Sequence, residues 1–210
     1  MNTRLIAPLT GILFVVLAIA AFLVSGETPG TDDSRREIIS YYLDNDSEVA
    51  ISGALLALAS VALAFFLGAL RQALRAAAGD EGGLSTVVLL GGLMIIVGAS
   101  IFAGLAFTLG DAADELPASA VLTLNALNSD LFFPVAVGIA VFNLGLGLAV
   151  LRHRGLPRPL GWVALVIGIA GLTPAGFFAF LATGIVIVWV SVVLAQRSSV
   201  SETPPAAIPD

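Results

Sequence analysis

Four stretches of the chain are apolar and free of charged residues, at residues 5–24, 49–70, 84–110 and 131–151. An α-helix rises 1.5 Å per residue, so about 20 apolar residues cross the ~30 Å hydrocarbon core of a bilayer. Each stretch meets this length. Charged residues make up 11% of the chain, against about 25% in soluble domains. The sequence therefore predicts an all-α membrane protein, built as a transmembrane helix bundle.

A fifth apolar stretch, residues 160–196, is too long for one span. Its 37 residues would extend about 55 Å as a single helix. Pro174 and Gly176 lie inside it, and Pro and Gly in close succession favour a turn. We therefore expect a hairpin of two spans, at residues 160–173 and 176–196, which gives six spans in all. The Ser- and Pro-rich residues 198–210 predict a disordered cytoplasmic tail.

The arginines indicate the orientation, because Arg near span ends is retained on the cytoplasmic side. With the N-terminus inside, six spans place seven arginines inside: Arg4, Arg71, Arg75, Arg152, Arg154, Arg158 and Arg197. Only Arg35 and Arg36 fall outside, whereas five spans would put Arg197 outside as well. We expect a bacterial plasma-membrane protein with both termini in the cytoplasm. The first apolar core exceeds the 7–15 residues typical of a signal peptide, so we expect an uncleaved anchor.

The predicted outer loops are acidic and contain two short amphipathic helices. Ser34 and Glu37 form a capping-box pattern, which predicts a helix start. Its apolar side would hold Ile38, Ile39, Tyr42 and Leu43. A helix lying on the outer membrane surface is the simpler interpretation, with Tyr41 and Tyr42 at headgroup level. A lid that gates a ligand is the alternative.

The second outer helix follows Asp114, Glu115 and Pro117, residues that favour a helix N-terminus. It is expected to continue into the fourth span and to bend near Pro134. Three polar side chains, Asn125, Asn128 and Asp130, would then face an outward-open crevice and form candidate ligand or pathway positions.

Asn143 is the strongest polar feature within the spans, which hold no ionisable residue at mid-membrane depth. Charged groups there usually mark ion pathways or proton relays, so their absence weakens proton-coupled transport and voltage sensing. An amide in lipid needs partners. We expect Asn143 to bond a neighbouring helix, and a substrate contact is the alternative.

Catalytic and metal chemistry finds little support in the composition. The chain has no Cys, no Lys and one His, which leaves no thiolate, no Schiff-base amine and few acid–base groups. We therefore expect a non-enzymatic protein with no cofactor and no metal ion. The net charge of −6 also argues against nucleic acid as a partner.

Small residues recur four positions apart in the spans, as in Gly53 and Ala57, Gly145 and Ala149, and Ala164 and Gly168. Such pairs allow helix backbones to approach closely in lipid. They predict a compact bundle, and the same faces could support a homo-oligomer or contact another membrane protein.

Residues 149–152, 156–162 and 172–178, together with the Tyr-Tyr segment at 34–43, resemble a group of uncharacterised multi-pass membrane proteins that is frequent among actinobacteria. The resemblance covers most of the chain and implies a bundle of about six spans. Its motifs are structural, so the resemblance implies no activity and assigns no functional residue.

Two functions remain in competition. The first is a helical bundle that binds membrane lipids or another apolar ligand, or acts as a membrane partner or sensor through its acidic outer face. The second is a small transporter or channel subunit with its site near Asn143 and the outer loops. Pro134 and Pro174 favour the second, because broken helices mark transport sites. The missing charges oppose it.

Overall fold

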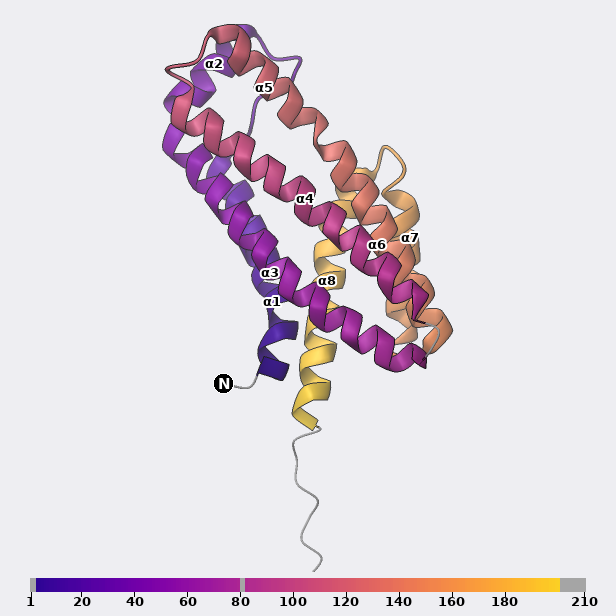
Figure 1. The fold of residues 1–210 in the computed structure, drawn as a ribbon. Helices are drawn as coiled ribbons and strands as arrows, with labels where there is room; N and C mark the ends of the chain where they lie inside the picture. Colours follow the sequence, from indigo (N-terminus) through magenta and orange to yellow (C-terminus); the bar gives the residue numbers. More distant parts are fainter. Residues whose placement is uncertain (1–2, 80–81, 201–210) are drawn as a thin grey trace, which may run out of the picture.

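The computed structural model describes residues 3–79 and 82–200, with side chains from 6–79 and 82–197. This part of the chain contains eight helices and no strand, which confirms the predicted all-α class. The helices are α1 (Thr3–Ser25), α2 (Arg35–Asp44), α3 (Asp46–Ala78), α4 (Gly83–Ala112), α5 (Ala118–Asp130), α6 (Phe132–His153), α7 (Arg158–Ala170) and α8 (Gly176–Val200). They form one elongated bundle (Figure 1).

Within the described residues, five segments are long and apolar enough to cross a membrane: Ile6–Ser25, Asp46–Ala78, Gly83–Ala112, Ala118–His153 and Gly176–Arg197. They match five of the six predicted spans. The fifth predicted span, 160–173, coincides with α7, whose 13 residues give a helix of only about 20 Å. α8 continues to Val200, into the predicted tail, and residues 201–210 lie outside the described residues.

α5 and α6 form an almost continuous helix that is interrupted at Leu131 (Figure 1). Pro134 explains the interruption, because it has no N–H to donate to the carbonyl of Asp130 and its ring crowds that oxygen. The break therefore falls one turn before the proline. The interruption lies three residues before Pro134, close to where the sequence predicts a bend.

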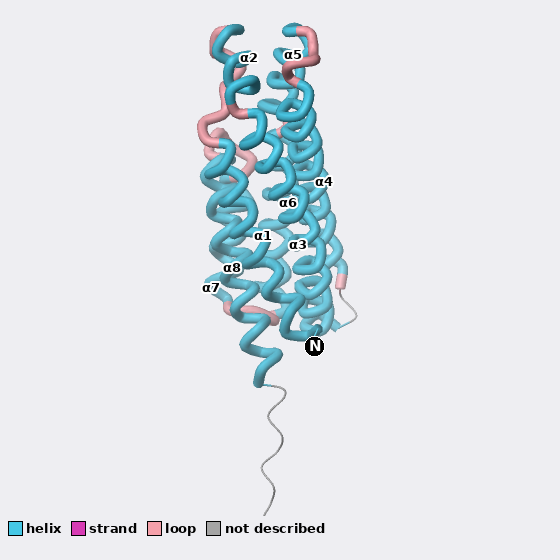
Figure 2. Tube along the Cα trace, turned by 90° about the vertical axis from the view of Figure 1, so that its left-hand side faces the viewer, coloured by secondary structure: helices cyan, strands magenta, loops and turns pink. Residues whose placement is uncertain are grey.

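The two ends of the bundle differ. At one end lie α2, α5 and the connecting residues 26–34, which together are called the cap (Figure 2). The N-terminus of α1 and the end of α8 lie at the opposite end, called the basic end. The described arginines of the basic end are Arg71, Arg75, Arg152, Arg154, Arg158 and Arg197, whereas the cap end carries Arg35 and Arg36.

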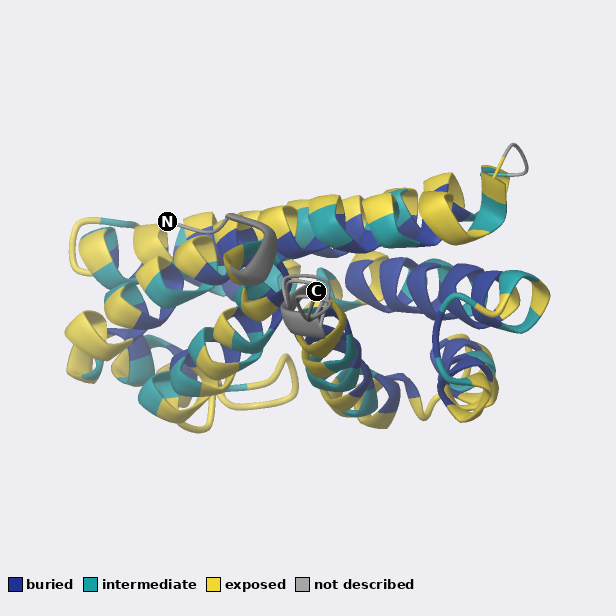
Figure 3. Cartoon of the chain, turned by 90° about the horizontal axis from the view of Figure 1, so that it is seen from below, coloured by how far each residue is buried: buried dark blue, intermediate teal, exposed yellow. Residues whose placement is uncertain are grey.

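Apolar side chains cover the outside of the bundle as well as its core. Figure 3 shows buried residues facing inward and exposed residues facing outward along the long helices. Val61 of α3, Val97 of α4, Val166 of α7 and Ile185 of α8 are exposed. Soluble monomers rarely expose such continuous apolar surface. Such a surface is compatible with a membrane protein.

Small residues bring the helix backbones together, as the four-residue pattern predicts. A Cβ added at Gly91 of α4 would lie 2.7 Å from the Cα of Phe142 in α6. One added at Gly53 of α3 would lie 2.8 Å from the carbonyl oxygen of Ala103 in α4. Glycine is required at such positions because no side chain fits between the helices. These small-residue faces pack within the bundle.

Candidate functional site

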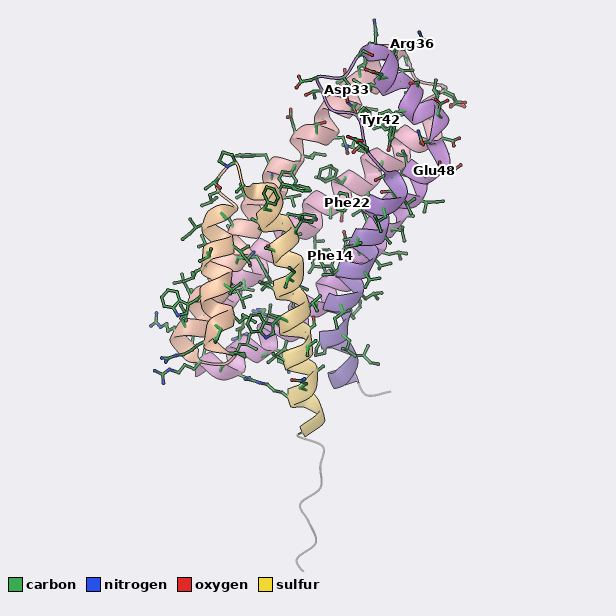
Figure 4. All side chains as sticks on the ribbon, turned by 180° about the vertical axis from the view of Figure 1, so that it is seen from behind. Phe14, Phe22, Asp33, Arg36, Tyr42 and Glu48 are labelled. Carbon is green, nitrogen blue, oxygen red and sulfur yellow. The ribbon has the colours of Figure 1, made fainter. Side chains whose placement is uncertain are left out.

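A groove runs between α1 and α8. The two helices touch near the basic end, where a Cβ at Gly11 would overlap the hydroxyl of Ser191. They diverge toward the cap end, and Phe14 and Phe22 lie in the space between them (Figure 4). The space that opens has a volume of about 490 Å³. This groove is the candidate site.

Apolar side chains form the walls of the groove. The two helices supply Phe14, Val15, Ala18, Ile19, Phe22 and Leu23 from α1, and Phe177, Phe180, Leu181, Gly184, Ile185, Ile187 and Val188 from α8. Ile95 of α4 and Ile139 of α6, both buried, close the groove from within. Thr183 carries the one polar side chain among the lining residues.

Thr183 is linked to Asn143, which lies in the core behind the groove. The Asn143 amide nitrogen donates to the Thr183 hydroxyl at 2.8 Å and to the carbonyl of Ile139 at 2.9 Å. The Thr183 hydroxyl donates in turn to the carbonyl of Ala179 at 2.7 Å. Asn143 is fully buried and is not among the lining residues. Its amide thus joins α6 to α8, as expected of an amide within lipid.

The side-chain oxygen of Asn143 is buried without a hydrogen-bond partner. We therefore expect Asn143→Val to change the free energy of unfolding by less than about 1 kcal/mol, because membrane hydrogen bonds average about 0.6 kcal/mol and the variant removes an unpaired oxygen. Thr183→Val should cost more, about 1–3 kcal/mol, because it leaves an Asn143 N–H unpaired. Unfolding in mixed micelles by sodium dodecyl sulfate measures both. The reverse order would contradict this assignment of the hydrogen bonds.

The cap is held by a second buried polar pair. The Tyr42 hydroxyl of α2 donates to the side-chain oxygen of Asn125 in α5 at 2.7 Å, and both residues are buried. Burial raises the pKa of Tyr42 above its usual value, so the hydroxyl remains protonated as the donor. The hydroxyl of Tyr41 donates to the carbonyl of Ser25 at 2.5 Å, which ties the end of α1 to α2.

The start of α2 agrees with the sequence prediction, but its apolar side has a different partner. The backbone N–H of Glu37 donates to the Ser34 hydroxyl and that of Ser34 to the Glu37 carboxylate, which completes the capping box. The hydrogen bonds with Ser34 hold the pKa of Glu37 below its usual value. Ile38 and Tyr42 are buried beside Val121 of α5 and face the interior of the cap.

Replacing Tyr42 with phenylalanine is expected to destabilise the cap by about 1–3 kcal/mol, because the Asn125 oxygen is left buried and unpaired. Hydrogen exchange of the α2 and α5 amides measures this, and faster exchange should be confined to these helices. The double variant Tyr42→Phe with Asn125→Leu should recover part of the loss. Equal exchange in Tyr42→Phe and the unmodified protein would show that the bond contributes nothing.

The four polar residues singled out in the sequence do not form one site. Asn125 is buried in the cap and faces no open crevice, Asn128 is half-buried and Asp130 is exposed. Asn143 lies 18 residues beyond Asn125 along α5 and α6, a helix rise of about 27 Å. Thr183 carries no comparable signal in the sequence, because hydroxyls in helices commonly bond to their own backbone.

The described residues contain no group of three metal-binding side chains. Comparisons with protein-family models, curated proteins and solved structures find no match for this chain. The resemblance to the actinobacterial membrane proteins therefore stays a prediction. The groove is interpreted from its geometry.

Proposed function

We propose that this protein is a non-enzymatic membrane protein that holds one hydrocarbon chain of a membrane lipid in the groove between α1 and α8. The observation that carries the proposal is an apolar groove of about 490 Å³ on a surface that is itself apolar. Small-molecule sites typically measure about 300–1,000 Å³ and have mostly apolar walls. In a bilayer an empty groove would lose van der Waals contacts along its walls, so a flexible chain fills it.

The length of the groove is compatible with a single hydrocarbon chain. The groove follows α1 from Phe14 to Gly26, about 18 Å at 1.5 Å per residue. Carbon atoms pack at about 3.5–4.0 Å, so an alkyl chain fits between its apolar walls.

The bonding of Thr183 also favours a hydrocarbon ligand. Its hydroxyl proton is used by the carbonyl of Ala179, and the same oxygen accepts from Asn143. The side chains of the groove thus offer a ligand no free donor. The transporter alternative depends on Asn143 as a lining residue, and the position of Asn143 behind the wall gives that alternative no support.

The charge at the mouth of the groove favours a lipid without net negative charge. The groove reaches Gly26 at the cap end, where Glu27 follows directly in the chain. The cap end carries these acidic residues: Glu27, Asp32, Asp33, Glu37, Asp44, Asp46, Glu48, Asp111, Asp114, Glu115 and Asp130. Against these acidic residues, the cap end has two arginines, Arg35 and Arg36. Like charges repel an anionic headgroup placed there.

The packing of α7 supports six spans. α7 and the turn after it run beside α6, from Gly161 against Leu151 to Gly176 near Phe132. Those two positions of α6 are about 28 Å apart along its axis, close to the ~30 Å core of a bilayer. Trp162 and Ile169 on α7 are exposed, as lipid-facing side chains would be. The hairpin thus reaches the depth of a span although α7 itself is short.

Cysteine labelling tests this topology in a chain that has no native Cys. With the arginine-rich end in the cytoplasm of a bacterium, Ala175→Cys is expected to react with an impermeant maleimide added outside whole cells. Ser198→Cys should react only after the cells are opened. Labelling of both from outside would remove the six-span arrangement with cytoplasmic termini, as would protection of both.

Photo-crosslinking tests the lipid site itself. The protein is reconstituted in vesicles of phosphatidylcholine that carry a diazirine on one acyl chain, and adducts are located by mass spectrometry. We expect adducts to concentrate on the groove positions of α1 and α8, such as Ala18 and Gly184. Leu58 and Val97, which face lipid outside the groove, serve as references. Equal labelling at all four positions would overturn the proposal.

A further inference from the structure

The geometry points to Phe22 and Phe180 as the residues that determine how long a chain the groove accepts. Their rings line both the groove and a second, smaller chamber of about 120 Å³, which also has walls from α3, α4 and α6. This inference rests on the proposed lipid function and assigns to these rings the chain-length selectivity of that same site.

The second chamber is a continuation of the groove toward the centre of the bundle. Its own walls come from Leu56 of α3, Ala99 and Phe102 of α4, and Phe132 and Val135 of α6. The remaining wall residues, which include Phe14, Phe22 and Phe180, also line the groove. The two spaces thus have six wall residues in common.

Aromatic rings close the passage. Phe22 of α1 and Phe180 of α8 meet edge to face, with ring centroids 5.7 Å apart, and Phe180 meets Phe132 at 6.3 Å in the same manner. The pair thus links α1 and α8, and both rings line the groove between these helices. Edge-to-face contacts are individually weak. No hydrogen-bonding group takes part in them, so rotation of a ring breaks no hydrogen bond.

Phe22 has room to move, because 53% of its side chain is exposed. A chain that ends before the ring pair occupies the groove alone. A longer chain must displace the rings to enter the chamber, whose volume of about 120 Å³ is about a quarter of that of the groove. The rings therefore favour chains that stop at the pair, and removing one ring should extend the preferred length.

Competition between lipids of one headgroup and different chain length tests this. The protein is incubated in vesicles of two saturated phosphatidylcholines whose chains differ by about four methylene groups, and the lipid that remains after purification is quantified by mass spectrometry. For Phe180→Ala we expect the ratio of long to short chains to rise by about fivefold, because the longer chain then gains the contacts of the chamber.

Phe178→Ala is the matched control, because Phe178 belongs to the same helix, is 71% exposed and lines neither cavity. The ratio of long to short chains retained by this variant should equal that of the unmodified protein. Phe22→Leu removes the other ring while retaining an apolar side chain. If Phe180→Ala does not fold, the chain-length ratio is measured in Phe22→Leu instead.

An unchanged ratio in the folded ring variants would overturn the chain-length role, even where diazirine adducts still map to the groove. Loss of those adducts in the unmodified protein would instead remove the proposed lipid site. The two failures are therefore distinguishable.

Discussion

Replacing Gly184 with leucine is expected to reduce the lipid that remains bound to the purified protein by about tenfold. Gly184 lines the groove, and a Cβ added there would lie 3.7 Å from Val15, an ordinary contact. The Cβ is thus accommodated, and the remainder of the leucine side chain occupies part of the groove. Tenfold weaker binding corresponds to about 1.4 kcal/mol. Native mass spectrometry of the protein in detergent measures the bound fraction.

Gly104→Leu is the control for this experiment. Gly104 is an exposed helical glycine in α4, and no atom lies within 4 Å of a Cβ built there. It gains the same side chain in a similar backbone but outside the groove, so lipid retention should not change. If both variants, or neither, lose lipid, the retained lipid is not held between α1 and α8.

Much of the helical framework follows from the sequence. The uncharged apolar stretches predict α1, α3, α4 and α6 because a bilayer requires continuous helices of this length. The capping box at Ser34 predicts the start of α2, and Pro174 with Gly176 predicts the turn before α8; the structure confirms both. These features are local. Each depends on residues within a few positions of one another.

The groove could not be predicted in the same way. It exists because α1 touches α8 at Gly11 and then diverges from it, a property of two helices about 170 residues apart in the chain. Its walls consist of Phe, Ile, Leu and Val, the same residue types that face lipid elsewhere. Hydrophobic pattern distinguishes lipid-facing from polar surfaces. It does not distinguish a lipid-facing wall from the wall of a lipid site.

The polar residues singled out in the sequence do not line the groove, for a related reason. A buried amide in lipid needs a partner, whether that partner is a ligand or a helix. Asn125 finds Tyr42 and Asn143 finds Thr183, separated in sequence by 83 and 40 residues. The sequence shows that each buried amide needs a hydrogen-bond partner. Only the packing shows that other side chains of the chain satisfy it.

Gly91→Ala is expected to lower the free energy of unfolding by about 1–3 kcal/mol, the usual cost of overpacking a core. The added methyl group would lie 2.7 Å from the Cα of Phe142 and would meet backbone, which cannot rotate away. α4 and α6 must therefore separate. Unfolding by sodium dodecyl sulfate, followed by circular dichroism, measures the loss against Gly104→Ala in the same helix.

Gly104→Ala should be neutral or stabilising by up to about 1 kcal/mol, because alanine favours the helix and nothing obstructs its methyl group. The difference between the two variants isolates the contact of α4 with α6. That contact also positions Ile95 and Ile139, which close the groove from within. Gly91→Ala should therefore weaken lipid retention as well as stability. A variant that loses stability but retains lipid fully would show that the groove is defined by α1 and α8 alone.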